Sequence, residues 1–326
     1  MPRHPYPRAL ALLAACATLA GILTACGATT HKPGSSSAGG CTAGQPVTHP
    51  DPKPAKVSVS LDSQAAAKVP AALKAKGTLT VAEDPSYAPN EFTSGNSNQP
   101  IGMDIDLAKA LGQSLGLKVK FANSSFDGII AGIQAGRYDL GMSSFTDTKD
   151  REKVVDFVTY FKAGTSIMVP KCNPKNINSD LDLCGKTVGA ENGTIQIDQL
   201  TKKDADGSIV AKCLKAGKKA PSGKGYPQQT DASSALQAKR IDAYIADSPV
   251  VDYALKKTTG AFQKAGSDLG VAPYGIAVPR TAGTLKYALQ AALQKLMADG
   301  TYKKILGNWG VASGAIDQSK INDAQG

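Results

Sequence analysis

Residues 139–148 read Asp-Leu-Gly-Met-Ser-Ser-Phe-Thr-Asp-Thr, and the pattern around them recurs along the chain. The first four residues, Asp139 to Met142, predict a short strand, and a polar loop follows it. Residues 128–136 predict a short helix directly before this strand. The chain therefore passes from a helix through a strand into a polar loop, which is typical of one unit of an α/β fold.

The same alternation continues on both sides of this stretch. Before it, Leu107, Leu111 and Leu115 recur at the spacing of an amphipathic helix between two strands. A second series of strands and helices begins at Lys186. Such alternation indicates an α/β sheet with parallel pairs of strands, so we expect two α/β lobes. The expected strands lie at 78–82, 118–121, 139–142, 186–189 and 243–246, and the expected helices at 104–115, 128–136, 232–239, 285–297 and 302–306.

The composition is that of an ordinary globular protein, with 42% hydrophobic and 20% charged residues among 326. The three histidines, His4, His31 and His49, all lie in the first 49 residues. A folded body without histidine cannot use Ser-His-Asp or Cys-His catalysis and cannot hold a metal through histidine. These features exclude many hydrolases and metalloenzymes, and we expect no cofactor and no metal.

Residues 1–25 have the pattern of an export signal. A basic start precedes an apolar run from Ala9 to Leu23, which is too short and too often interrupted by Thr and Gly for a membrane span. The run ends in Leu-Thr-Ala-Cys at 23–26, which resembles the bacterial lipobox and implies a lipid on Cys26. A plain cleavage site or an uncleaved anchor is the alternative.

Residues 26–67 are expected to form a lipidated, flexible tether. Residues 27–56 are rich in Gly, Ser, Thr, Ala and Pro, and they bury too little apolar surface to offset the entropy of ordering. We therefore expect a secreted protein that is anchored to the outer face of the cytoplasmic membrane. The formal charge of +10 fits contact with anionic lipids and wall polymers. No tract typical of nucleic-acid binding is present, so such a partner is not expected.

The cysteines are expected to be structural. The six are Cys16, Cys26, Cys41, Cys172, Cys184 and Cys213. Cys16 leaves with the signal and Cys26 takes the lipid, so four remain in an oxidising compartment. Four cysteines allow three pairings; we favour Cys184–Cys213 within one lobe and Cys41–Cys172, which would fix part of the tether. No Cys-x-x-Cys pair occurs, which argues against zinc or thioredoxin-like chemistry.

Several blocks of sequence, in order across residues 76–312, match one known family. In the first half they are Val-Ala-Glu-Asp-Pro-Ser-Tyr-Ala-Pro-Asn-Glu-Phe at 81–92, Gly-Met-Asp-Ile-Asp-Leu at 102–107, Ser-Phe-Asp-Gly-Ile-Ile at 125–130, the stretch 139–148, and Arg-Glu-Lys-Val-Val-Asp-Phe at 151–157. In the second half they are Leu-Cys-Gly-Lys-Thr-Val-Gly at 183–189, Asn-Gly-Thr at 192–194 and Arg-Ile-Asp-Ala-Tyr-Ile-Ala-Asp at 240–247. The chain resembles the family 3 extracellular solute-binding proteins, the polar amino-acid receptors of ABC importers.

The resemblance implies a type II periplasmic-binding-protein fold, in which two α/β lobes are joined by two crossing strands. Lobe 1 is expected to comprise 68–167 and 273–326, and lobe 2 to comprise 168–272. The crossing strands are expected near 166–169 and 272–278. A ligand that contacts both lobes stabilises the closed form, which would then dock on a membrane permease.

The resemblance also implies a site for a free amino acid. Arg151 is suited to a bidentate grip on the ligand carboxylate, with backbone N–H groups near Thr146 and Thr194 beside it. Asp247 is suited to the ammonium, together with the Thr146 hydroxyl and the Ser144 carbonyl. Ser144 stands where glycine is common in the family.

The ligand side chain is expected to pack against Tyr87 and Phe126. The loop from Leu79 to Ile101 contains three acids, Asp84 among them, and no Lys or Arg. An anionic side chain would meet like charge there, whereas Asp84 can accept hydrogen bonds from an amide, an ammonium or a guanidinium. We therefore expect glutamine, arginine, lysine or ornithine rather than glutamate or aspartate.

Two other functions share this scaffold. One is an enzyme such as a cyclohexadienyl dehydratase, and the other is the ligand-binding partner of a sensor. The lipobox and the Arg151–Asp247 pair favour a receptor over an enzyme, because that pair recognises an amino acid without reacting with it. We expect a monomeric receptor with no catalytic residues.

Overall fold

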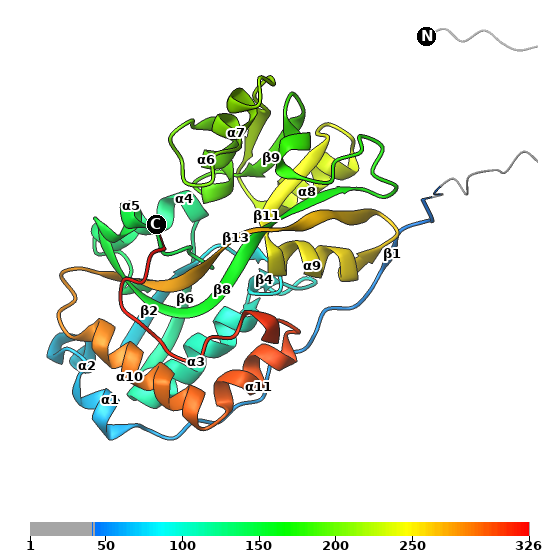
Figure 1. The fold of residues 1–326 in the computed structure, drawn as a ribbon. Helices are drawn as coiled ribbons and strands as arrows, with labels where there is room; N and C mark the ends of the chain where they lie inside the picture. Colours follow the sequence, from blue (N-terminus) through cyan, green and yellow to red (C-terminus); the bar gives the residue numbers. More distant parts are fainter. Residues whose placement is uncertain (1–40, 42, 326) are drawn as a thin grey trace, which may run out of the picture. The chain divides into compact units, whose positions relative to one another are not determined.

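The computed structural model describes residue 41 and residues 43–325 of the chain (Figure 1). The predicted signal at 1–25 and the predicted lipidation site Cys26 lie outside the described residues, as does Cys16. Within the described part, no helix has the length and apolar character needed to cross a bilayer.

Eight strands form one mixed sheet with the order β10-β9-β11-β8-β13-β7-β2-β6. Their bounds are β2 Thr78–Glu83, β6 Lys118–Asn123, β7 Leu140–Gly141, β8 Val155–Pro170, β9 Thr187–Glu191, β10 Ser222–Tyr226, β11 Ala243–Asp247 and β13 Phe262–Pro279. β9 is parallel to β10 and β11, and β2 is parallel to β6 and β7. Within each parallel group the carboxyl ends meet at one edge, where α/β proteins commonly bind ligands.

Two long antiparallel strands, β8 and β13, join the parallel groups. β8 has 16 residues and β13 has 18, so each extends through both halves of the sheet. Their pairing shifts register three times between Ala265 and Gly275. The result is a two-lobed α/β fold, with β2, β6 and β7 in lobe 1 and β9, β10 and β11 in lobe 2. The crossing segments predicted near 166–169 and 272–278 lie within β8 and β13.

Helices and apolar side chains cover the lobe 1 strands. In α3 (Met103–Leu115), Leu107, Leu111 and Leu115 are buried, as their spacing predicts. A glycine is required where α3 begins, because Gly102 has a φ of 140° and a Cβ there would lie 2.0 Å from the carbonyl oxygen of Asn90. The other elements of this lobe are α1 Ser63–Ala67, α2 Ala71–Lys76, β3 Ser86–Tyr87, β4 Glu91–Thr93, β5 Pro100–Ile101, α4 Phe126–Gln134, α5 Lys149–Glu152, α10 Leu285–Ala298, α11 Thr301–Asn308 and η2 Ala312–Gly314.

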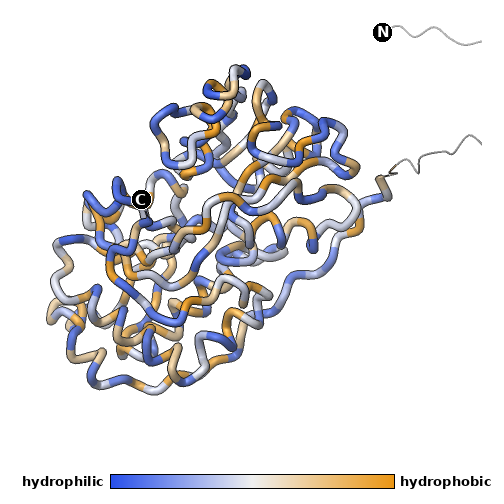
Figure 2. Tube along the Cα trace, in the orientation of Figure 1, coloured by the Kyte–Doolittle hydropathy of each residue, from blue (hydrophilic) through white to orange (hydrophobic). Residues whose placement is uncertain are grey.

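Lobe 2 has its own buried core and a disulfide within it. Its elements besides the sheet are η1 Asp180–Leu183, α6 Ile195–Thr201, α7 Ile209–Lys215, α8 Gln229–Gln237, α9 Ser248–Lys257 and β12 Thr258–Thr259. Cys184 is bonded to Cys213 of α7, and Cys41 is bonded to Cys172 at the end of β8, which confirms both predicted pairs. In Figure 2 the apolar colours follow the central strands, whereas the peripheral loops are hydrophilic.

The segment 43–62 differs from the flexible tether predicted for 26–67. Val47 and Thr48 form the short strand β1, which pairs antiparallel with β12. Further along, Val57 and Val59 pack against the core of lobe 1. The composition of this segment does not indicate that it is ordered, because local propensity does not hold it in place. It is held by strand pairing with a distant part of the chain and by two alternating apolar side chains. The described part of the predicted tether is therefore bound to the body and is not free.

Candidate functional site

Buried acids lie at the carboxyl ends of parallel strands in both lobes. Asp84 follows β2 in lobe 1, while Glu191 and Asp247 end β9 and β11 in lobe 2. The two lobes approach each other closely beside them, since a Cβ on Gly193 would lie 2.8 Å from the Cβ of Asp127. The polar ends of both parallel groups therefore face one another across the boundary between the lobes.

Arg151 crosses this boundary. It lies in the short helix α5, where the Thr148 hydroxyl accepts a hydrogen bond from its backbone N–H at 3.2 Å. One guanidinium nitrogen donates to the carbonyl of Thr146 at 2.8 Å, and the other donates to the carbonyl of Gly193 in lobe 2 at 2.9 Å. The guanidinium also lies over the Phe126 ring, 5.5 Å from its centroid. The structure thus holds a fixed cation where the two lobes meet.

Asp247 ends β11 with a buried carboxylate. It precedes α9, yet its side chain makes no capping hydrogen bond. One carboxylate oxygen instead accepts a hydrogen bond from Gln196 at 2.7 Å. Burial raises the pKa of Asp247 to about 6, although Tyr274, Gln196 and Arg151 act in the opposite direction. The group is therefore ionised above about pH 6 and is costly to keep charged without a cationic partner.

Ser144 and Thr194 use their hydroxyls within the protein. Ser144 has a φ of 53°, which explains why the family commonly has glycine at this position. Its hydroxyl donates to Glu91 at 3.2 Å and accepts from Asn90 at 2.9 Å. The Thr194 hydroxyl donates to the carbonyl of Glu191 at 2.7 Å and caps α6. Because the Ser144 N–H donates to Asp104 and the Thr194 carbonyl accepts from Asp198, what these two residues have left for a ligand is the Ser144 carbonyl and the Thr194 N–H.

Three stacked aromatic rings, those of Tyr87, Phe126 and Phe145, lie on the lobe 1 side and are here called the aromatic ladder. Tyr87 and Phe126 stack with their centroids 5.4 Å apart, and Phe145 stacks on Phe126 at 4.5 Å. The structure therefore brings together the two aromatic residues predicted to pack on the ligand. They contact each other in this conformation, so a ligand would bind against the edge of the ladder or separate Tyr87 from Phe126.

Asp84 uses both of its carboxylate oxygens to hold the loop. One oxygen accepts from the backbone N–H of Ser86 at 3.1 Å, and the other accepts from the backbone N–H of Phe126 at 3.0 Å. The second bond satisfies a backbone N–H at the start of α4, where the N-cap residue Ser125 makes no side-chain capping bond. Asp84 therefore fixes the aromatic ladder, and burial raises the pKa of its carboxyl.

Glu191 was not singled out from the sequence, and it is the acid with the most free bonding capacity. It is 1% exposed, and neither of its carboxylate oxygens has a hydrogen bond of ordinary geometry within the described part of the chain, although the Tyr87 hydroxyl and the Asp84 carboxyl are close enough to act on its pKa. Burial raises its pKa to about 9, and the nearby Asp84 contributes further. The hydroxyl of Tyr87 is likewise buried without a hydrogen bond of ordinary geometry among the described residues, and its polar neighbours are Glu191 and Gln229. Such groups fit a ligand that donates several hydrogen bonds and carries positive charge.

A second cluster of buried acids, Asp104 and Glu91, holds the loop at 143–146 through hydrogen bonds. Asp104 accepts hydrogen bonds from the backbone N–H of Ser144 at 3.1 Å and from the Tyr160 hydroxyl at 2.6 Å. Burial raises the pKa of Asp104 to about 7, and it raises that of Glu91 well above its ordinary value. Among the residues that the structure describes, no group of acids, histidines and cysteines is arranged to hold a metal ion. The cluster is therefore a buried hydrogen-bond network that holds Ser144 in its unusual conformation.

Comparison with known proteins identifies the family. Residues 79–312 match the bacterial extracellular solute-binding proteins, family 3. The chain belongs to this family. The fold and the family predicted from the sequence are thereby confirmed, and the protein is a solute-binding receptor.

Relatives of this solute-binding protein include named arginine receptors. It is 32% identical over 258 residues to the arginine-binding protein ArgT of Corynebacterium glutamicum, which covers 79% of this chain and 82% of ArgT. It is 29% identical over 236 residues to the ABC transporter arginine-binding protein 1 of Escherichia coli, which covers 69% of this chain and 87% of the relative. An ancestral arginine-binding protein, solved with arginine bound, is 34% identical with a TM-score of 0.63, covering 72% of this chain and 98% of that structure.

Proposed function

We propose that this solute-binding protein is the receptor of an ABC importer for a cationic amino acid, with arginine as the first candidate. The observation that carries the proposal is the pair of buried acids Glu191 and Asp84, of which Glu191 has no hydrogen bond of ordinary geometry to either carboxylate oxygen among the described residues. An arginine side chain presents five N–H donors and a positive charge, so it matches this pair of acids. Relatives named as arginine-binding proteins support the proposal.

We assign the α-carboxylate of the ligand to Arg151 and its α-amino group to Asp247. Arg151 is held between carbonyl oxygens of both lobes, so a ligand carboxylate can replace or join these acceptors and gain a charge-assisted bidentate contact. Asp247 supplies the anion for the ammonium from lobe 2. Because the two groups lie on different lobes, a bound amino acid stabilises the closed arrangement.

The acids near the ligand side chain set the order of preference among ligands. Arginine gains both charge attraction and several hydrogen bonds from Glu191 and Asp84. Lysine and ornithine gain the charge attraction with fewer donors, and glutamine can donate only from its neutral amide. Glutamate would place a further carboxylate against two buried acids, which is unfavourable in a closed cleft. We therefore rank arginine above lysine and ornithine, then glutamine, then glutamate.

The location and the mode of action follow from the sequence signals together with the family. We infer that Cys26 carries a lipid, that lobe 1 comprises 68–167 and 273–326 with 168–272 as lobe 2, and that the monomer delivers its ligand to a membrane permease. A receptor is favoured over an enzyme because the curated relatives are named as binding proteins. A structural neighbour described as a precursor of cyclohexadienyl dehydratase is itself named an amino acid-binding protein.

Calorimetry with a panel of ligands tests the proposal. The purified mature protein is titrated with arginine, lysine, ornithine, glutamine and glutamate, and its turnover of prephenate and arogenate is measured in parallel. We expect the affinities to follow the order given above and no turnover to be detected. Tighter binding of glutamate than of arginine, or conversion of prephenate, would contradict the proposal.

A further inference from the structure

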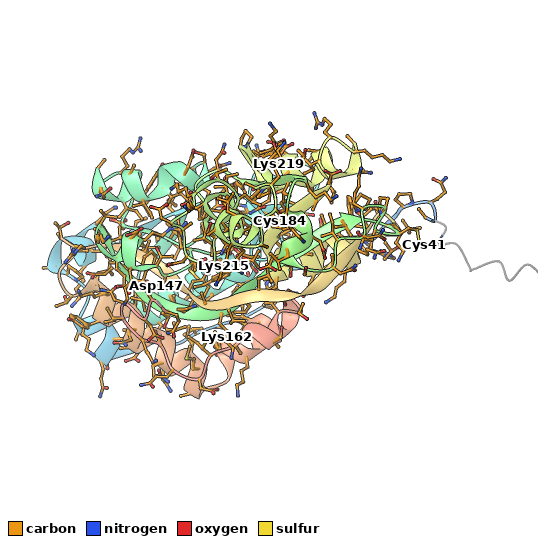
Figure 3. All side chains as sticks on the ribbon, turned by 45° about the horizontal axis from the view of Figure 1, so that its top comes forward. Cys41, Asp147, Lys162, Cys184, Lys215 and Lys219 are labelled. Atoms are coloured by element: carbon orange, nitrogen blue, oxygen red, sulfur yellow. A yellow bond between two sulfur atoms is a disulfide. The ribbon has the colours of Figure 1, made fainter. Side chains whose placement is uncertain are left out.

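The segment from Cys41 to Asp62, here called the N-terminal strap, contacts both lobes. It precedes residue 79, where the match to the family begins. On lobe 2, Cys41 is bonded to Cys172, and β1 pairs with β12. Figure 3 labels Cys41 where the described chain begins, and Cys184 of the other disulfide within lobe 2. The strap is therefore attached covalently to the lobe opposite the one in which the chain continues.

On lobe 1 the strap follows helices α3 and α11. The carbonyl of Lys53 accepts from Asn308 at 2.8 Å, and the backbone N–H of Ala55 donates to Asp106 at 2.7 Å. Farther along, the backbone N–H of Asp62 donates to the carbonyl of Ser114 at 2.8 Å. These bonds hold the strap to lobe 1 along its second half.

Asp51 lies between these two attachments and joins both lobes through one carboxylate. One oxygen accepts hydrogen bonds from Lys257 and Tyr253 of α9 in lobe 2, and the other accepts from Ser94 of lobe 1 at 2.5 Å. The carboxylate is 16% exposed. Burial acts to raise the pKa of Asp51, but the bonds from Lys257, Ser94 and Tyr253 outweigh it, so the pKa lies below its ordinary value. The bridge is therefore charged at neutral pH.

The connection is short and stiff. Four residues, 49–52, separate Thr48 on lobe 2 from Lys53 on lobe 1. Two of them, Pro50 and Pro52, flank Asp51, and proline restricts the backbone to extended conformations. An extended chain spans at most about 3.6 Å per residue, so the lobes cannot separate far here without breaking strap contacts. A third interlobe contact adds to this, since the Tyr253 ring lies 5.6 Å from that of Phe92 in lobe 1.

We propose that the N-terminal strap is a third connection between the lobes, and that Asp51 and the Cys41–Cys172 disulfide hold the ligand-free receptor toward its closed form and thereby raise ligand affinity. The inference deepens the proposed function and rests on it for its binding measurements. When only part of a population is competent to bind, the apparent dissociation constant rises in inverse proportion to that part. Releasing the strap therefore weakens ligand binding without touching the site.

Small-angle X-ray scattering and calorimetry on the same variants test the proposal. The variants are Asp51→Ala and the pair Cys41→Ser with Cys172→Ser. The matched control is the pair Cys184→Ser with Cys213→Ser, which removes a disulfide within lobe 2, and Asp51→Glu is the conservative variant. We expect a larger radius of gyration for both strap variants without ligand and a dissociation constant for arginine raised at least about threefold. With saturating arginine, their radius of gyration should equal that of the wild type.

The control pair should leave the radius of gyration and the dissociation constant for arginine unchanged, and Asp51→Glu should retain most of the wild-type affinity. An unchanged radius of gyration in Asp51→Ala would overturn the proposal, and so would weaker binding without any expansion, since that would indicate a local effect on the site. The scattering arm needs no ligand. If arginine fails to bind the wild type, the proposed function fails while the scattering still tests the strap.

Discussion

The two acids that flank the expected ligand side chain differ in how fully the protein already uses them. Asp84 in lobe 1 accepts two backbone hydrogen bonds and holds its loop and the aromatic ladder. Glu191 in lobe 2 accepts no backbone hydrogen bond within the described residues, although it is as deeply buried; its polar neighbours are the side chains of Tyr87 and Asp84. One acid therefore builds the site, and the other retains its capacity for a ligand. A buried acid in a cleft is informative about ligand chemistry only once its existing partners have been counted.

The largest expected effect comes from the groups that bind every amino acid, whatever its side chain. Arg151→Ala or Asp247→Ala should abolish measurable binding of arginine and glutamine alike. Removal of one partner leaves a ligand charge buried and unpaired, which typically costs about 2–5 kcal/mol. Calorimetry measures the loss, circular dichroism confirms the fold, and Asp204→Asn, at an exposed position after α6, is the control. Binding within a few-fold of wild type in either variant would show that the site is misassigned.

The pH dependence of binding should distinguish cationic from neutral ligands. Glu191, with a pKa of about 9, is protonated at neutral pH and must release its proton when a cation binds beside it. The affinity for arginine should therefore increase with pH, by about twentyfold between pH 7 and 8.5. The affinity for glutamine should be nearly constant over this range, because Asp247, with a pKa of about 6, is already ionised. Parallel titrations measure both slopes, and equal slopes would refute the role given to Glu191.

Replacing the ionisable carboxyl of Glu191 by an amide should stabilise the ligand-free protein. Its pKa is raised from the ordinary 4.5 to about 9, so the folded state retains a proton that the unfolded chain releases above pH 4.5. The contribution of this group to stability therefore falls as the pH rises toward 9. Glu191→Gln avoids this loss, and we expect its melting temperature at pH 8 to exceed that of wild type by about 2–4 °C. A scan at pH 4 is the control, where the difference should be smaller; a lower melting temperature at pH 8 would contradict the account.

Much of this molecule could be predicted from local patterns. The family and most strands of the two parallel groups follow from periodicity and from short motifs such as residues 139–148, although β10 was not among the expected strands. The cysteine count allowed three disulfide pairings, and the favoured one is the pairing that the structure has. The strap was missed because its attachments are distant in sequence, as in the pairing of Val47 with Thr259. Glu191 was missed for a related reason. A lone acid in a sequence is usually solvated, and only the folded arrangement shows that this one is buried beside Asp84.

Ser144 shows a third limit of the sequence. The sequence shows a serine at a position where the family commonly has glycine. It does not show the hydrogen bonds that allow this serine to adopt a left-handed conformation. The hydrogen bonds from Asn90 and to Glu91 hold its side chain, and Asp104 accepts from its backbone N–H. These partners lie 40 to 54 residues away, so the compensation for the left-handed conformation emerges only after folding.

The most direct test of the account compares the preference for arginine over glutamine in the wild type and in Glu191→Gln. Both ligands are titrated into both proteins by calorimetry at pH 8, and the ratio of the two dissociation constants is taken for each protein. We expect arginine affinity to fall at least about tenfold in Glu191→Gln while glutamine affinity changes less than about threefold, so that the preference for arginine largely disappears. A preference that survives the substitution unchanged would contradict the claim that Glu191 selects a cationic ligand.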